Sequence, residues 1–181
     1  HRNRTNCNIG LVEERLVGVM PTDAVSGGVK EKDTVITGAA RGMGRATAER
    51  FAREGAKLVL NDRDQQPLDE LAHDLKNKGA EVIGIAGDVA SEDDIKRIMT
   101  EAVVTFGGID ILVANAGVIP EADLASATID LWDHTMAVDG RGMFLSCKYA
   151  AAEMVKAGKG AIVCLSSISA FAGQKGQAVY G

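Results

Sequence analysis

The chain has 181 residues, of which 46% are hydrophobic and 25% charged, and its formal net charge is -5. A chain of this length buries one sizeable core, so we expect a single domain. No apolar run approaches the roughly 18 residues of a membrane span, which predicts a soluble protein without a membrane partner. The negative net charge and the absence of a dense Lys/Arg cluster disfavour nucleic acid as a partner.

Cysteine and histidine usage predicts neither a disulfide framework nor a metal site. Cys7, Cys147 and Cys164 are odd in number and widely separated in sequence, so we expect free thiols in a reducing compartment. The three histidines do not cluster, and we expect no structural metal. Residues 1–19 do not resemble a secretory signal, which predicts a cytoplasmic location.

Residues 1–28 are expected to form an N-terminal extension, partly non-native or disordered. A domain over residues 29–181 follows, in which short β-branched runs alternate with helical periodicities. The first strand is predicted over 34–37, and the helix after it presents Ala48, Phe51 and Ala52 on one face before Gly55 ends it. A second strand follows over 57–60.

Asp64 is a candidate cap for the next helix, and Gly79 a candidate stop. The expected buried stripe of this helix consists of Leu68, Leu71, Ala72 and Leu75. After a strand over 82–86, Ser91 opens a helix in the manner of a capping box with Asp94. The apolar positions of that helix are Ile95, Ile98, Met99, Ala102 and Phe106.

The last predicted elements are a strand over 111–113, one long helical stretch from about 130 to 156, and a strand over 161–165. The long stretch carries Trp132, Met136, Phe144 and Leu145 among its apolar positions. Strict alternation of strands and helices predicts an α/β fold with a doubly wound parallel sheet, the Rossmann fold, in three α/β/α layers. The expected strand order is 3-2-1-4-5.

A glycine-rich run, T-G-A-A-R-G-M-G at residues 37–44, lies between the first strand and its helix. Glycines let backbone N–H groups approach a pyrophosphate at the positive end of a helix dipole. A glycine cluster alone is more often a loop than a ligand site, but its place between strand and helix predicts nucleotide binding. The residues expected to hold the cofactor here are Gly38, Arg41, Gly42, Met43 and Gly44.

The spacing of this run differs from G-x-G-x-x-G and resembles the fingerprint of the short-chain dehydrogenase/reductase family, of the classical type, from about Lys32 to the end of the chain. Asp62 ends the second strand, where a carboxylate accepts hydrogen bonds from both adenosine ribose hydroxyls and repels a 2′-phosphate. This favours NAD. Arg41 and Arg63 lie nearby and offer pairing to a phosphate, so NADP remains the alternative.

Two further segments resemble the family in the expected order, each at the end of a strand. Asp88 and Val89 resemble the pair that contacts adenine, with the carboxylate facing the exocyclic amine and the valine covering the ring. Asn115, Ala116 and Gly117 resemble the N-A-G segment, which the resemblance implies stabilises the sheet and lines the cofactor groove. Open α/β sheets bind ligands at the carboxyl ends of their strands, which supports both assignments.

The resemblance also implies the catalytic residues. Ser167 holds the substrate oxygen, and Tyr180, thirteen residues later, gives or takes the hydroxyl proton. Without the resemblance, a serine at a strand end is more often a hydrogen-bond partner of nearby backbone groups, and a single tyrosine is more often a packing residue than a catalyst. Asp139 stands where the family usually carries an asparagine that helps to hold a water molecule of the proton relay. A carboxylate accepts hydrogen bonds but cannot donate one as an amide does. The family's lysine would fall at position 184, beyond Gly181.

The resemblance implies an oxidoreductase that interconverts a secondary alcohol and a ketone, and Asp62 favours NAD as its cofactor. Its partners would be a small-molecule alcohol or ketone and, in the full-length form, further copies of itself in a homo-oligomer. We expect this chain to be a C-terminally truncated form that is inactive by itself. The alternatives are a non-catalytic dinucleotide-binding sensor or scaffold, which Asp139 suits, and an α/β domain without coenzyme.

Overall fold

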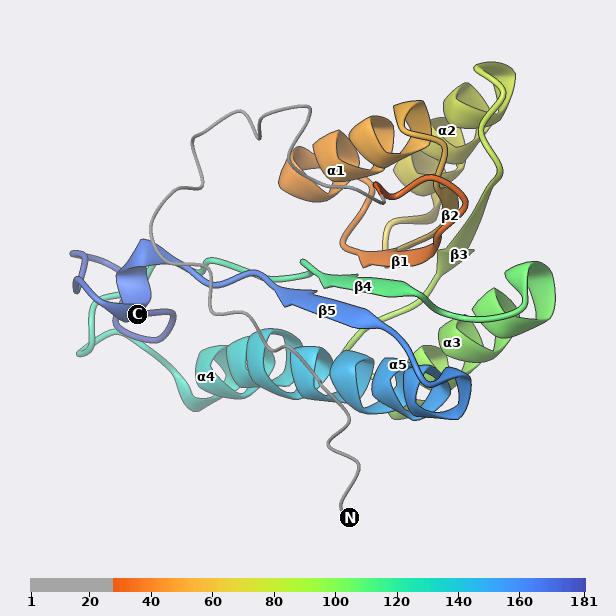
Figure 1. Ribbon diagram of the computed structural model, residues 1–181. Helices are drawn as coiled ribbons and strands as arrows, with labels where there is room; N and C mark the ends of the chain where they lie inside the picture. Colours follow the sequence, from red (N-terminus) through yellow and green to blue (C-terminus); the bar gives the residue numbers. More distant parts are fainter. Residues whose placement is uncertain (1–27) are drawn as a thin grey trace, which may run out of the picture.

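The structure is a computed structural model that describes residues 28–181 (Figure 1). Cys7, His1 and the remainder of the expected extension up to residue 27 lie outside the described residues. None of the helices in the described part has both the length and the apolar character that crossing a membrane requires.

Five parallel strands form one sheet in the order β3-β2-β1-β4-β5, as predicted. The strands are β1 (Asp33–Thr37), β2 (Lys57–Asp62), β3 (Val82–Ala86), β4 (Ile111–Ala114) and β5 (Ala161–Cys164). In the central register, Val35 of β1 pairs with Val59 of β2 on one side and with Leu112 of β4 on the other. β5 is an edge strand that pairs with β4, and Val163 and Cys164 in it are exposed.

Helices cover both faces of the sheet, which gives the three predicted layers (Figure 1). The helices are α1 (Gly42–Arg53), α2 (Gln65–Asn77), α3 (Glu92–Phe106), α4 (Ile129–Thr135) and α5 (Met143–Ala157). In Figure 1, α1 and α2 lie on one side of the sheet, and α3, α4 and α5 lie on the other. A short 3₁₀ turn spans Ile168–Ala170.

The core has two parts because successive side chains of a strand point to opposite faces. Ile36 and Leu58 pack with the apolar stripe of α2 on one face, whereas Val35 and Leu112 pack with α3 and α5 on the other. The predicted stripe of α2 is buried: Leu68, Leu71, Ala72 and Leu75. Of the positions predicted for α3, Ile95, Ile98, Met99 and Ala102 are buried and Phe106 is partly buried.

The predicted helix caps are only partly realised. Ser91 Oγ accepts a hydrogen bond from the N–H of Asp94, but the Asp94 carboxylate accepts from the N–H of Asp88 rather than completing a capping box. Asp64 is the N-cap residue of α2, yet its side chain makes no capping hydrogen bond. Gly55 and Gly79 follow the C-cap residues of α1 and α2 and have φ values of 81° and 87°, as expected of helix-stopping glycines.

The long helical stretch expected from 130 to 156 is present without a break, but its middle is π-helical. α4 passes into a π-helical turn at Met136–Gly142, and α5 begins only after it. Leu145 is buried, but Trp132 is 50% exposed and Phe144 63% exposed, so these two apolar side chains do not contribute to the core. A π turn adds one residue to a helical turn, and the hydrophobic periodicity did not reveal it.

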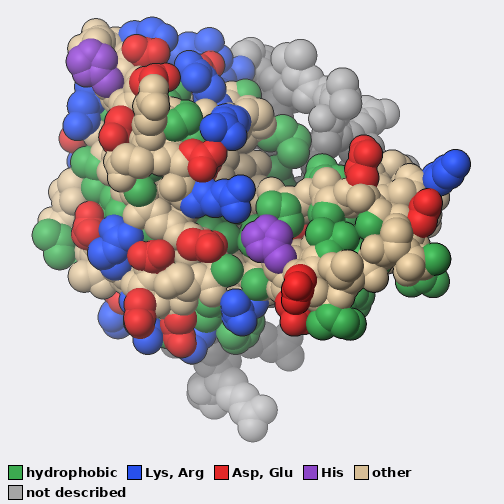
Figure 2. All heavy atoms as spheres, turned by 180° about the vertical axis from the view of Figure 1, so that it is seen from behind, with side chains coloured by type: hydrophobic (Ala, Val, Ile, Leu, Met, Phe, Trp, Pro, Cys, Tyr) green, Lys and Arg blue, Asp and Glu red, His purple; other side chains and the backbone are tan. Residues whose placement is uncertain are grey.

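Acidic and basic side chains are intermixed over the face of the molecule shown in Figure 2, and hydrophobic side chains lie between them. Several charges of the described residues form pairs at helical spacing, such as Arg50 with Glu54 at 2.9 Å. This mixture agrees with the modest net charge of the sequence.

Candidate functional site

The glycine-rich run forms a tight turn between β1 and the amino end of α1. Gly38 and Gly42 have φ values of 63° and 54°, a backbone region that L side chains rarely adopt. A Cβ on Gly38 would lie 2.8 Å from the Cα of Ala116, and a Cβ on Gly44 would lie 2.1 Å from the carbonyl oxygen of Gly38. The turn can therefore follow this path only with glycine at positions 38 and 44.

The amino end of α1 has no side-chain cap within the described part of the chain. Arg41 is the N-cap residue, its side chain makes no capping hydrogen bond, and the first turn carries no acidic residue. The first N–H groups of a helix lack partners within the helix and carry a partial positive charge, so they attract anions. Met43 is 67% exposed in this first turn.

A groove with a volume of about 320 Å³ lies at the carboxyl ends of the strands. Its walls include ten of the twelve residues predicted to bind the cofactor: Gly38, Arg41, Gly42, Asp62, Arg63, Asp88, Val89, Asn115, Ala116 and Gly117. The other two, Met43 and Gly44, do not line it; Gly44 instead provides the close approach of α1 to the turn. The structure thus brings together residues that are up to 79 positions apart in the chain, as in the Ala116–Thr37 contact.

Asp62 connects the glycine turn to the start of α2. Its Oδ2 accepts a hydrogen bond of 3.0 Å from the N–H of Ala40, and its Oδ1 accepts one of 3.1 Å from the N–H of Asp64. A carboxylate offers about four acceptor positions, so each oxygen retains one for a ligand.

The Asp88 segment turns the chain from β3 into α3. Asp88 Oδ1 accepts a hydrogen bond of 2.8 Å from the N–H of Ala90. Val89 is buried, and it packs closely on the π-helical turn, because a Cβ on Gly142 would lie 2.7 Å from Val89 Cγ2. The valine therefore presents little of its surface to the groove.

Asn115 ties β4 to the glycine turn. Its Nδ2 donates to the carbonyl oxygens of Thr37 at 2.9 Å and of Gly38 at 3.0 Å, while its backbone N–H donates to Thr37 Oγ1 at 3.1 Å. These three hydrogen bonds join the end of β4 to the end of β1 and to the glycine turn.

Asp139 lies in the π-helical turn and is anchored to the segment after β4. Its Oδ1 accepts a hydrogen bond of 2.8 Å from the N–H of Val118, a residue that lines the groove. Its Oδ2 is buried and has no hydrogen-bond partner among residues 28–181. Burial raises the pKa of Asp139, opposed in part by the hydrogen bond from Val118 and by the charge of His134.

Ser167 and Tyr180 lie outside the groove, in the segment after β5. Ser167 is the N-cap of the 3₁₀ turn, and its Oγ accepts a hydrogen bond of 3.2 Å from the N–H of Ser169. Tyr180 is half-buried beside the buried Val179. Ala122 holds this segment close to the loop after β4 through a backbone hydrogen bond of 2.7 Å to Gly176.

Several groove residues were missed in the sequence. Asn61, Asp64, Gly87, Val118 and Val138 also line the groove. Asn61 is fully buried, and its Nδ2 donates to the carbonyl oxygens of Ile85 and Gly87, so it joins β2 to the end of β3. Its position next to Asp62 at a strand end is a signal that could have identified it.

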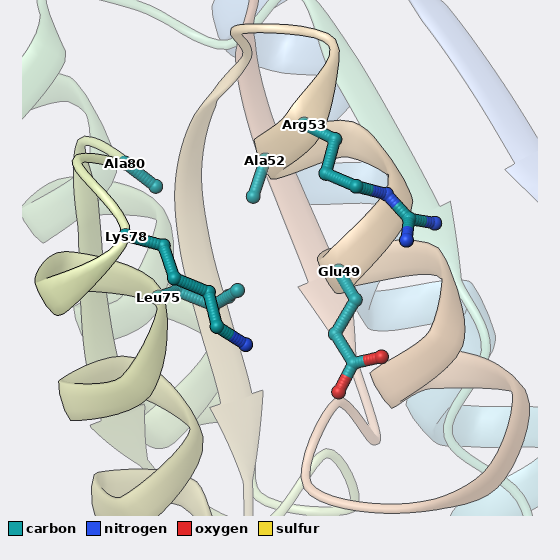
Figure 3. Close-up of a pocket in the computed structure, with 6 residues that line it drawn as sticks. All are labelled: Glu49, Ala52, Arg53, Leu75, Lys78 and Ala80. Carbon is teal, nitrogen blue, oxygen red and sulfur yellow. The ribbon is translucent and has the colours of Figure 1, made fainter.

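A second hollow lies elsewhere, between α1 and α2 (Figure 3). It is lined by Glu49, Ala52, Arg53, Leu75, Lys78 and Ala80. These residues come from the carboxyl-terminal halves of the two helices and the loop after α2, far along both helices from the glycine turn. Within residues 28–181, no group of three or more His, Cys, Asp or Glu side chains is arranged to hold a metal ion.

Comparisons with known proteins find similar sequences in one family. The family model for short chain dehydrogenases matches residues 32–181. An uncharacterized oxidoreductase of Thermotoga maritima is 40% identical over 149 residues, which are 82% of this chain and 59% of that protein. The cis-4-hydroxycyclohexanecarboxylate dehydrogenase of Sinomonas cyclohexanicum is 38% identical over 151 residues, 83% of this chain and 60% of the relative.

A solved structure is also similar. A short chain dehydrogenase/reductase from Burkholderia phymatum, crystallised in complex with NAD, superposes with a TM-score of 0.82 at 32% identity, over 84% of this chain and 54% of that one. The chain therefore spans between one half and three fifths of the length of these proteins. The family match over residues 32–181, together with these relatives, shows that the chain belongs to the short-chain dehydrogenase/reductase family.

Proposed function

We propose that the protein is an NAD-dependent oxidoreductase that interconverts a secondary alcohol and a ketone. The observation that carries this proposal is the groove itself, in which the glycine turn, Asp62 and the N-A-G segment meet at the uncapped amino end of α1. Its residues fit a dinucleotide, because only glycine fits at positions 38 and 44 and a carboxylate stands at the end of β2.

In this proposal, backbone N–H groups of the 38–44 turn bind the diphosphate, and Asp62 accepts hydrogen bonds from the adenosine ribose. Asp88 and Val89 lie against adenine, and the 115–117 segment lines the cofactor groove. A bound nicotinamide dinucleotide supplies the hydride acceptor or donor. The choice of NAD over NADP rests on Asp62, and the NAD complex of the Burkholderia phymatum relative supports it.

The proposed acid/base is Tyr180, with Ser167 holding the substrate oxygen. Both lie on the segment that Ala122 fastens beside the loop after β4. Asp139 is proposed to support proton transfer from its place in the π-helical turn, where it accepts the hydrogen bond from the groove-lining Val118. The substrate is proposed to be a small alcohol or ketone, as the name of the Sinomonas cyclohexanicum relative supports.

The similarity to oxidoreductases favours an enzyme over the non-catalytic sensor or scaffold, since it extends through the segment that contains Ser167 and Tyr180. The expected cytoplasmic location and homo-oligomeric assembly stay predictions.

Fluorescence titration with NADH and NADPH tests the cofactor proposal. The unaltered chain is expected to bind NADH more tightly than NADPH, and Asp62→Ala to reduce that preference by weakening NADH. Equal binding of the two by the unaltered chain would overturn the NAD assignment. In the whole protein, Tyr180→Phe is expected to abolish alcohol-dependent NADH formation while leaving NADH binding intact.

A further inference from the structure

Two arginines at the mouth of the groove face the same carboxylate. Nη2 of Arg41 lies 2.9 Å from Oδ2 of Asp64, and Nε of Arg63 lies 3.9 Å from Oδ1 of the same side chain. Arg41 is the N-cap residue of α1, whereas Arg63 and Asp64 are consecutive residues between β2 and α2, with Asp64 as the N-cap residue of α2. All three line the groove.

The position of Asp64 is not explained by helix capping. As the N-cap residue of α2 it would ordinarily accept a hydrogen bond from a first-turn N–H, but its side chain makes no such bond. The carboxylate instead points to the arginines, and the backbone N–H of Asp64 donates to Asp62 Oδ1 at 3.1 Å. This hydrogen bond holds the Asp62 carboxylate against the backbone of Asp64.

The pairing changes what the groove can bind. A guanidinium next to the ribose-binding carboxylate is the group that would pair with a 2′-phosphate. Here both candidate guanidiniums already have the same anionic partner, the Asp64 carboxylate. A 2′-phosphate would have to displace Asp64 and then lie near two carboxylates.

We propose that Asp64 is a specificity-determining residue, which excludes a 2′-phosphate by occupying Arg41 and Arg63. The inference rests on the proposed dinucleotide function and deepens it. Asp62 accepts hydrogen bonds from the unphosphorylated ribose, and Asp64 keeps the guanidinium groups of Arg41 and Arg63 from binding a 2′-phosphate. Asp64 contributes to specificity without touching the ribose.

The test compares Asp64→Asn with the unaltered chain in NADH and NADPH titrations by fluorescence. Asparagine is a good N-cap residue, so α2 should remain intact. The variant is expected to bind NADPH roughly three- to tenfold more tightly than the unaltered chain does, because one or two exposed charge pairs are released. Its affinity for NADH is expected to stay within about twofold of that of the unaltered chain. The gain should shrink as salt is added.

Glu54→Gln is the matched control. Glu54 pairs with Arg50 at 2.9 Å at the far end of α1, so this variant removes one negative charge and one exposed ion pair away from the groove. It is expected to leave both affinities unchanged. In the double variant Asp64→Asn with Arg41→Ala, the gain in NADPH affinity should disappear.

The outcomes separate the two proposals. If the unaltered chain binds NADH but Asp64→Asn strengthens NADPH no more than Glu54→Gln does, the role of Asp64 is overturned while the proposed function stands. An equal improvement of NADH and NADPH in Asp64→Asn would overturn that role as well. If neither the unaltered chain nor any variant binds either nucleotide, the proposed function fails and the inference falls with it.

Discussion

The Nδ2 atom of Asn115 lies 2.6 Å from the point that a Cβ on Gly44 would occupy. The same atom donates hydrogen bonds to the carbonyl oxygens of Thr37 and Gly38. The end of β4, the glycine turn and the first turn of α1 are thus packed against one another around one amide group. This contact fixes the path of the turn before any ligand binds.

Gly44→Ala should disrupt this contact. The new Cβ would lie 2.1 Å from the carbonyl oxygen of Gly38, a backbone atom that cannot move without shifting the turn. We expect a loss of roughly 1–3 kcal/mol in the free energy of unfolding, typical of overpacking, and at least about a tenfold loss of NADH affinity. Chemical denaturation and NADH titration measure the two effects.

Gly173→Ala is the control for that substitution. A Cβ at Gly173 meets no atom of the described residues within 4 Å, and the residue lies in an exposed loop. It should change neither quantity. Equal effects of the two variants would show that the close approach at Gly44 is unimportant.

Asn115→Ala should destabilise the protein by about 1–3 kcal/mol, because it removes two side-chain hydrogen bonds and leaves the carbonyl oxygens of Thr37 and Gly38 without this donor. The exposed Asn77, the last residue of α2, provides the comparison. Asn77→Ala is expected to stay within about 0.5 kcal/mol of the unaltered protein. Thermal unfolding measures both variants. An equal decrease in the unfolding midpoint of the two variants would contradict the role of Asn115.

The fold followed from the sequence because its central strands and helices carry unambiguous patterns. The run at 57–60 is apolar after its first residue, as a strand buried on both faces requires, and the stripe from Leu68 to Leu75 repeats at helical spacing. The π-helical segment of the long helix at Met136–Gly142 left no such signal. A π turn shifts the hydrophobic phase by a fraction of a turn, which exposed apolar residues such as Phe144 conceal.

Some features of the candidate site could likewise be predicted from the sequence, and others could not. The glycine turn and Asp62 were recognisable because their chemistry depends on backbone geometry and strand ends, which are local in sequence. The pairing of Arg41 and Arg63 with Asp64 was not, because it depends on side-chain directions and on contact between two segments that are separate in the sequence. The nearness of Cys147 to Cys164 was missed for the same reason.

Asp139 should make stability depend on pH. Burial raises its pKa in the folded protein, so the folded state holds the proton more tightly than the unfolded state does. The stability that this proton contributes is present below the ordinary aspartate pKa and is lost as the pH rises through the raised value. Asp139→Asn should remove that loss and keep the hydrogen bond from Val118.

We therefore expect Asp139→Asn to be more stable than the unaltered protein at neutral pH, by on the order of 1 kcal/mol, since it removes the charge from a buried oxygen that has no partner among the described residues. The difference should vanish in acid. Urea denaturation at a series of pH values checks this, and a difference that is constant across the series would refute the proposed protonation of Asp139.

The two described cysteines should differ in reactivity although their sulfur atoms lie only 3.6 Å apart. Burial, with the neighbouring thiol of Cys164, raises the pKa of Cys147 to about 12, whereas Cys164 is exposed. Iodoacetamide at mildly alkaline pH should label Cys164 at least about tenfold faster than Cys147, because the thiolate is the nucleophile. Peptide mass mapping distinguishes the sites, and equal rates would contradict the burial of Cys147.

The central claim is that the backbone amides of the glycine turn bind the diphosphate of a dinucleotide at the amino end of α1. Amide chemical-shift mapping of the ¹⁵N-labelled chain during NADH addition tests it most directly. We predict that the largest shifts fall on residues 38–44, with further shifts at Asp62 and residues 115–117. Saturable shifts confined to the hollow between the far ends of α1 and α2, around Glu49 and Lys78, would contradict the claim, as would the absence of any shift in the glycine turn.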